Sequence, residues 1–63
     1  MTVDVEGLGK ITASKEILNE ISIAFGVSRD FYLKVGCNAL ADKCNKVSGS
    51  VHRALNDSGY YDD

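Results

Sequence analysis

The side chains best suited to chemistry in this sequence are two cysteines and one histidine, Cys37, Cys44 and His52. The cysteines are seven residues apart, so on one helix they would share a face at a separation of about 10.5 Å along the axis. A disulfide needs Cα atoms within about 7 Å, and zinc ligands normally come in threes or fours at closer spacing. We therefore expect two small buried apolar cysteines, a surface histidine and no bound metal.

Catalysis has little support in this composition. General acid–base or nucleophilic catalysis needs groups that converge in a shielded pocket, whereas the carboxylates here are scattered along the chain. The sequence contains no phosphate-binding loop, no dinucleotide-binding glycine pattern and no HExxH motif. We expect a protein that is not an enzyme, with no cofactor and no small-molecule substrate.

Basic residues are concentrated in the middle of the chain, although the formal net charge is −2. Residues 26–53 hold five basic and two acidic side chains, and both ends of the chain are acidic. A negative total gives no general attraction to nucleic acid or anionic lipid, so a solvated helix face is the favoured interpretation of the basic segment. Contact with DNA phosphates is the alternative. The DNA-binding candidates are Lys10, Arg29, Lys34, Lys43, Lys46 and Arg53.

The 63 residues predict a single small domain with a thin core, because a chain this short buries only about 60% of its unfolded surface. Such domains usually need disulfides, a metal or a partner subunit. Since the first two are not favoured here, we expect self-association or binding to another protein. No apolar run approaches the roughly 20 residues of a membrane span, and the start MTVDVEG does not resemble a signal peptide. A cytoplasmic location without a membrane partner is therefore expected.

Glycines divide the N-terminal part of the chain, which like the rest contains no proline. Val3 and Val5 alternate with acidic residues, which predicts a short strand with one buried face. Residues 8–12 form either a second short strand or an irregular segment before the first helix. A hairpin this small is unstable alone, so it must pack on helices or pair with another chain.

Helical spacing of apolar residues predicts a first helix over Ser14–Phe25, with serine as its N-cap and Gly26 as the left-handed residue that ends it. A second helix is expected over Ser28–Lys46 and a third over Ser50–Asn56. One long bent helix over residues 28–56 is nearly as favourable, because only the Ser-Gly-Ser segment interrupts the pattern.

The fold class is therefore mainly α, with two or three helices and a short N-terminal strand or hairpin. Gly36 is expected inside a helix at a cost of about 1 kcal/mol. After a stop at Gly59, Tyr60 should fold back, and the terminal Asp62 and Asp63 should be solvated. The expected core is Val5, Ile11, Ile17, Leu18, Ile21, Phe25, Phe31, Val35, Leu40, Cys44, Val47, Val51 and Leu55.

The segment Ile21–Val35 has an apolar residue before the glycine, small residues beside it and apolar residues after it. It resembles the helix–turn–helix junction of small bacterial DNA-binding proteins. The same junction, over about residues 8–45, resembles ribbon–helix–helix proteins, which implies a dimer whose paired N-terminal strands enter the major groove. The helix–turn–helix resemblance implies that Arg29, Asp30, Leu33 and Lys34 face the major groove.

Two further segments resemble known proteins. Residues 50–60 are similar to the end of the DNA-binding headpiece of lactose-repressor-type proteins, and EGLGKITASKEI resembles uncharacterised proteins of bacterial mobile elements. The favoured function is a non-enzymatic, self-associating or accessory protein-interaction module that buries leftover apolar surface. The alternative is a dimeric DNA-binding transcriptional regulator. The protein-interaction candidates are Phe31, Leu33, Tyr60 and Tyr61, with Ile23 and Val27 beside them.

Overall fold

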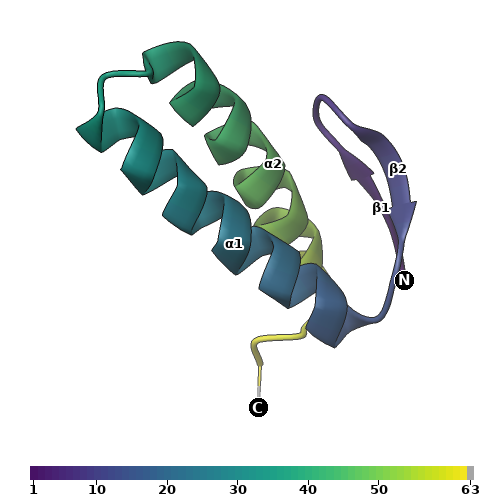
Figure 1. Ribbon diagram of the computed structural model, residues 1–63. Helices are drawn as coiled ribbons and strands as arrows, with labels where there is room; N and C mark the ends of the chain where they lie inside the picture. The colour runs from purple at the N-terminus through teal and green to yellow at the C-terminus, as the bar shows by residue number, and fades with distance from the viewer. Residues whose placement is uncertain (63) are drawn as a thin grey trace.

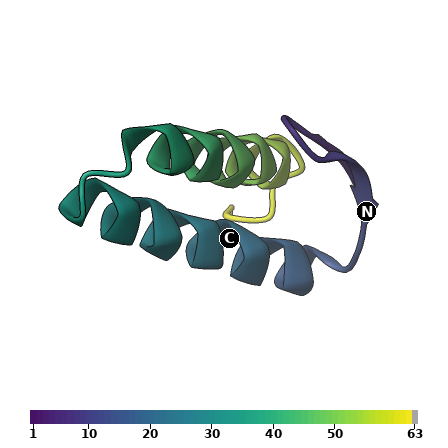
Figure 2. The same ribbon diagram turned by 45° about the horizontal axis from the view of Figure 1, so that its top comes forward.

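The computed structural model describes residues 1–62, over which the chain forms a β-hairpin followed by two antiparallel helices (Figure 1). The strands are β1 (Thr2–Val5) and β2 (Gly9–Thr12), and the helices are α1 (Lys15–Lys34) and α2 (Asn38–Asp57). The mainly α fold class with an N-terminal hairpin is confirmed. The β-hairpin packs on α2 through β1 (Figures 1 and 2). The expectation for Asp63 lies outside the described residues, whereas Asp62 is exposed as expected.

The hairpin has the one-sided burial that its alternating sequence predicts. Its antiparallel register pairs Val3 with Ile11 and Asp4 with Lys10. Val3 and Val5 are almost completely buried and belong to the hydrophobic core with residues of α2. Successive side chains of a strand point to opposite faces, so Asp4 between the two valines is exposed. Of the two alternatives for residues 8–12, the second strand is the one that forms.

Helix α1 begins where the sequence predicts it. The Ser14 hydroxyl accepts a hydrogen bond from the Ile17 amide at 3.2 Å, which satisfies one of the free N–H groups of the first turn. The helix then continues through Gly26, so the predicted end at that residue is wrong. Gly26 lies inside the α1–α2 interface, where a Cβ atom would be 3.6 Å from the Ser48 hydroxyl. Its small size suits a close helix approach, and no turn forms there.

The residue that ends α1 is Gly36, ten positions further along the chain. Gly36 has φ +82°, a conformation that side-chain-bearing residues rarely adopt. Its amide donates to the Leu33 carbonyl at 3.2 Å, and the Cys37 amide donates to the Tyr32 carbonyl at 2.8 Å. These two bonds form a Schellman motif. The expectation that Gly36 lies within a helix is therefore wrong, whereas the predicted stop at Gly59 is confirmed by its φ of +79°.

Residues 48–50 do not interrupt α2, so the predicted boundaries within residues 28–56 are wrong. The small side chains instead allow the two helices to approach closely. The Ser22 hydroxyl donates to the Ser48 carbonyl at 3.2 Å, and the Ser48 hydroxyl donates to the Ser22 carbonyl at 2.8 Å. The Ser50 hydroxyl donates to the Lys46 carbonyl one turn back at 2.7 Å. Side chains that satisfy backbone groups in this way are compatible with a continuous helix.

The core lies between the hairpin, the first half of α1 and the second half of α2. Ala41 is buried although the sequence did not place it in the core, and Val3, which the strand pattern put on the buried face, belongs in the core list as well. Four predicted core residues are exposed. Ile17 and Phe31 lie on the side of α1 that faces away from α2, whereas Val35 and Leu40 lie near the end of the molecule that the hairpin does not cover. The remaining predictions are confirmed as buried (Val5, Leu18, Cys44, Val47, Val51 and Leu55) or half-buried (Ile11, Ile21 and Phe25).

Candidate interaction surface

Apolar side chains run along the side of α1 that faces away from α2. Val27 is 65% exposed and Phe31 is 59% exposed, while Ile17 and Ile23 are each 54% exposed. Leu18, by contrast, is fully buried against residues of α2. Val27 follows Leu18 by nine residues, or about two and a half helical turns, so it points in the opposite direction. We name this surface the outer strip of α1 and define it as Ile17, Ile23, Ala24, Val27 and Phe31.

Charged residues lie on the line of the outer strip towards both of its ends: Glu16 and Glu20 towards the N-terminal end and Lys34 towards the C-terminal end. Glu20 precedes Val27 by seven residues and Lys34 follows it by seven. Since seven residues make about two helical turns, both charges lie close to the line of Val27. Among residues 1–62, neither Glu20 nor Lys34 takes part in an ion pair. The strip is therefore an apolar stretch with acidic residues near its N-terminal end and a base near its C-terminal end.

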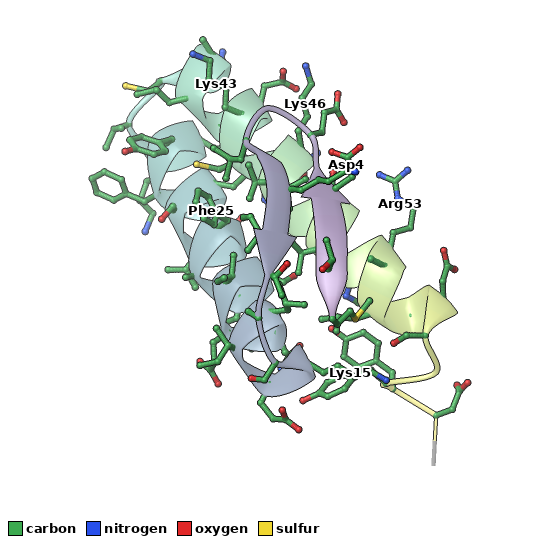
Figure 3. The ribbon with its side chains drawn as sticks, turned by 90° about the vertical axis from the view of Figure 1, so that its right-hand side faces the viewer. Asp4, Lys15, Phe25, Lys43, Lys46 and Arg53 are labelled. Carbon is green, nitrogen blue, oxygen red and sulfur yellow. The ribbon has the colours of Figure 1, made fainter. Side chains whose placement is uncertain are left out.

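A groove of about 490 Å³ opens on another side of the molecule, between the hairpin turn and the two described helices. Phe25 and Cys44 contribute apolar surface to it, and Lys43 and Lys46 lie beside the hairpin turn (Figure 3). Apart from the two lysines, Glu6 is the charged residue in its lining, and none of the lining residues is a histidine. The complete lining is Glu6, Gly7, Leu8, Phe25, Tyr32, Leu40, Lys43, Cys44, Lys46 and Val47.

The predicted interaction residues are divided between different surfaces. Phe31 is on the outer strip, where its ring lies edge-on to Tyr32 at 5.6 Å between centroids. Leu33 is also more than half exposed, but it lines a shallow depression on the other side of α1 together with Arg29 and Asn38. The structure therefore does not bring Phe31 and Leu33 onto one surface.

The chain folds back after α2, as expected for Tyr60, and both Tyr60 and Tyr61 pack against the rest of the molecule. Tyr60 is half-buried against the core. The Tyr61 hydroxyl donates to Oδ1 of Asn19 on α1 at 2.7 Å, and its ring lies 5.0 Å from that of His52. His52 is exposed, as the sequence predicts. Both tyrosines thus have intramolecular contacts that account for their positions.

The predicted DNA-binding residues of α2 lie on one side of that helix. Lys43, Lys46 and Arg53 project from α2 away from α1 (Figure 3). The Lys46 ammonium lies 3.1 Å from Oδ2 of Asp42. The hydrogen bond to Asp42 and the negative charges of Asp42 and Glu6 raise the pKa of Lys46 above 10.5. The positive charge of Lys46 is therefore partly compensated by these acidic side chains of the same chain.

The other three basic candidates are elsewhere. Arg29 is held between the helices, where its guanidinium lies 3.1 Å from Oδ1 of Asp30 and donates to Oδ1 of Asn45 at 2.9 Å. Lys10 is opposite Asp4 in the hairpin register, and Lys34 is in the last turn of α1. The six basic residues consequently do not form one continuous surface.

The cysteines have different environments. Cys44 is buried, as predicted, whereas Cys37 is exposed because the helix ends at Gly36 and leaves Cys37 in the connection to α2. Both thiols are free. Within residues 1–62 there is no group of three or more histidine, cysteine or acidic side chains that could hold a metal ion. Neither described helix combines the length and the apolar character that a membrane crossing requires.

The outer strip contains two residues that the sequence alone placed in the core, Ile17 and Phe31. Ile17 was assigned to the core because it fits the helical spacing of Leu18 and Ile21. Its seven-residue spacing to Ala24 and then to Phe31 is the signal that could have identified it as part of a separate face, since such spacing defines a line along a helix. No protein-family model matches the chain, and comparison with curated proteins and with solved structures finds no match either.

Proposed function

We propose that this chain is a non-enzymatic interaction module that binds a protein, either another protein or a second copy of itself, through the outer strip of α1. The observation that supports the proposal is the exposure of Ile17, Ile23, Val27 and Phe31, each more than half accessible to water. Contiguous exposed apolar surface on a small protein is typical of an interaction site. The proposal includes a cytoplasmic location, where the exposed thiol of Cys37 would stay reduced.

The strength of such binding follows from the area that remains exposed. Complete burial of a large apolar side chain contributes about 1.5–3 kcal/mol. Burial of the remaining half at each of the four large residues therefore contributes roughly 1 kcal/mol per residue. Part of that total is offset by the loss of translational and rotational freedom. We expect reversible binding in which Val27 and Phe31, the most exposed members, have the largest effects.

The proposal is tested by photo-crosslinking in the cells that produce the protein. A photoreactive phenylalanine analogue at Val27 should give a discrete covalent adduct, because this side chain is at the centre of the outer strip. The same analogue at Arg53, which is exposed and points away from α1 (Figure 3), is the matched control and should give none. Failure to obtain an adduct from Val27, or equal adducts from both positions, would overturn the proposal.

A dimeric DNA-binding regulator is the second candidate, and the alignment of Lys43, Lys46 and Arg53 on one side of α2 supports it (Figure 3). Binding through phosphates weakens steeply as salt increases. Titration against random-sequence duplex DNA at low and moderate salt tests this function. Salt-sensitive binding that is lost in an Arg53→Ala, Lys43→Ala double variant is the expected result, and an absence of binding at low salt would refute it.

A further inference from the structure

We propose that the partner of the outer strip is a second copy of this chain, bound with the two α1 helices antiparallel and a two-fold axis at Val27. The inference rests on the proposed function and specifies its partner. It depends on the order of charged and apolar residues along α1, which becomes self-complementary when one helix is reversed.

Charge complementarity selects the antiparallel direction. Glu20 and Lys34 are equally distant from Val27, seven residues before it and seven after it. When α1 is paired antiparallel about Val27, Glu20 faces the partner's Lys34, and by symmetry Lys34 faces the partner's Glu20. Parallel pairing in register would instead place like charges together. Because neither side chain forms an ion pair among residues 1–62, both are available for the contact.

The apolar residues match in the same register. Ile23 precedes Val27 by four residues and Phe31 follows it by four, so Ile23 faces the partner's Phe31 on each side of the axis. Ala24 is small and exposed, which leaves space for the partner's Phe31 ring. Val27 meets the partner's Val27 at the centre. A large ring packed beside a small residue is the complementarity that a helix–helix interface requires.

The second copy can bind without displacing any described element. Val27 points away from the buried side of α1, and the hairpin packs on α2 (Figure 2). A helix of 20 residues is about 30 Å long, and a strip one helix wide buries less than the roughly 800 Å² per partner of a standard interface. An area of roughly 800 Å² would be about a fifth of the 4230 Å² that the chain exposes. We therefore expect a concentration-dependent dimer with a dissociation constant in the micromolar range.

The first test measures mass by sedimentation equilibrium over a series of protein concentrations. The unmodified chain should convert from monomer to dimer. Val27→Glu should remain monomeric, because it brings two carboxylates together at the axis, while its circular dichroism stays that of the folded chain. Glu20→Lys should weaken the dimer roughly ten-fold, because two attractive contacts become repulsive. Lys34→Glu should have the same effect, and the double variant should recover most of the affinity.

Matched charge changes outside the strip provide the controls. Asp57→Lys and Lys43→Glu alter exposed residues of α2 by the same amounts and should leave the dissociation constant within about two-fold. If these controls weaken the dimer as much as the strip variants do, net charge and not the proposed pairing is responsible. That result would overturn the inference, as would a dimer that the Val27→Glu substitution does not affect.

Disulfide crosslinking tests the helix direction independently. In a Cys37→Ser background, which removes the exposed thiol, Glu20→Cys and Lys34→Cys chains are oxidised separately and then as a mixture. Antiparallel pairing predicts a crosslinked species in the mixture and little in either chain alone. Crosslinking of each variant with itself would establish parallel pairing and overturn the inference.

The two proposals can fail separately. If the purified chain remains monomeric at all concentrations while Val27 forms an adduct with a different protein in cells, the inference of a second copy is wrong and the interaction function stands. If Val27 gives no adduct in cells and the purified chain is monomeric, both are wrong. An adduct with twice the mass of the chain supports both.

Discussion

Replacement of Gly26 by alanine should stabilise the protein, whereas the same replacement at Gly36 should destabilise it. Gly26 is inside α1, and an added methyl group would make an ordinary contact, 3.6 Å from the Ser48 hydroxyl. Gly36 ends α1 with φ +82°, and an added methyl group would meet no atom within 4 Å. The two substitutions therefore differ in backbone conformation and not in steric crowding.

The magnitudes follow from these conformations. Inside a helix, alanine is favoured over glycine by about 0.8–1.0 kcal/mol, so Gly26→Ala should increase the free energy of unfolding by nearly that amount. In the left-handed region, a residue with a side chain is disfavoured by about 1–2 kcal/mol, so Gly36→Ala should lower it by about 1 kcal/mol or more. For a domain of this size each kcal/mol shifts Tm by roughly 4–8 °C. The two variants should consequently differ in Tm by about 10 °C.

Thermal unfolding followed by far-ultraviolet circular dichroism provides the measurement. All variants must be compared at one low protein concentration, because self-association would make Tm depend on concentration. Gly49→Ala is the matched control: Gly49 is inside α2, where an added methyl group would lie 3.9 Å from the Arg53 guanidinium, and this substitution should also raise Tm. A lower Tm for Gly26→Ala combined with a higher Tm for Gly36→Ala would refute the continuous α1 helix and restore a turn at Gly26.

Three other substitutions test the core, an ion pair and the C-terminal segment. Leu55→Ala, at a fully buried position, should remove about 2–5 kcal/mol of stability and leave most of the chain unfolded at 25 °C by circular dichroism; a folded variant would contradict the core assignment. Asp42→Asn should lower the pKa of Lys46, followed by NMR titration, because Asp42 is the main cause of its elevation. Since the folded-state pKa is raised, the stabilisation by this pair is present below pH 10.5 and is lost as the pH rises through the pKa of Lys46; an unchanged titration would contradict the pairing. Tyr61→Phe removes the hydrogen bond to Asn19 and should lower Tm by a few degrees, since such a bond contributes about 0.5–1.5 kcal/mol; no change would mean that the bond adds nothing in solution.

Local stereochemistry was predictable from the sequence at three places. The alternation at Val3 and Val5 predicted a strand with one buried face, and both residues are buried. Ser14 was identified as the N-cap of the first helix, and its hydroxyl accepts the expected hydrogen bond. The stop at Gly59 was likewise predicted correctly. The serine cap and the glycine stop depend on contacts within a few residues along the chain, and the valine alternation reflects the local geometry of a strand.

Glycine was the source of the main errors, because its sequence signal is the same in a turn and in a close helix contact. Gly26 and Gly36 each have apolar and polar neighbours that are compatible with a helix end. What distinguishes them is the presence of Ser48 on α2 beside Gly26. That contact joins residues far apart in the sequence, so helix capping patterns could not predict it.

The sequence by itself determined the secondary-structure classes, the start of α1 and the greater part of the buried core. Only the tertiary structure decided which side of α1 is buried. Apolar residues surround most of this helix, so helical spacing is satisfied by Ile17 and Phe31 as well as by Leu18. The side bearing Ser22 and Gly26 packs on α2, where small residues allow close approach and the two serines exchange hydrogen bonds. The larger apolar residues on the opposite side remain exposed because a single neighbouring helix can cover only one face.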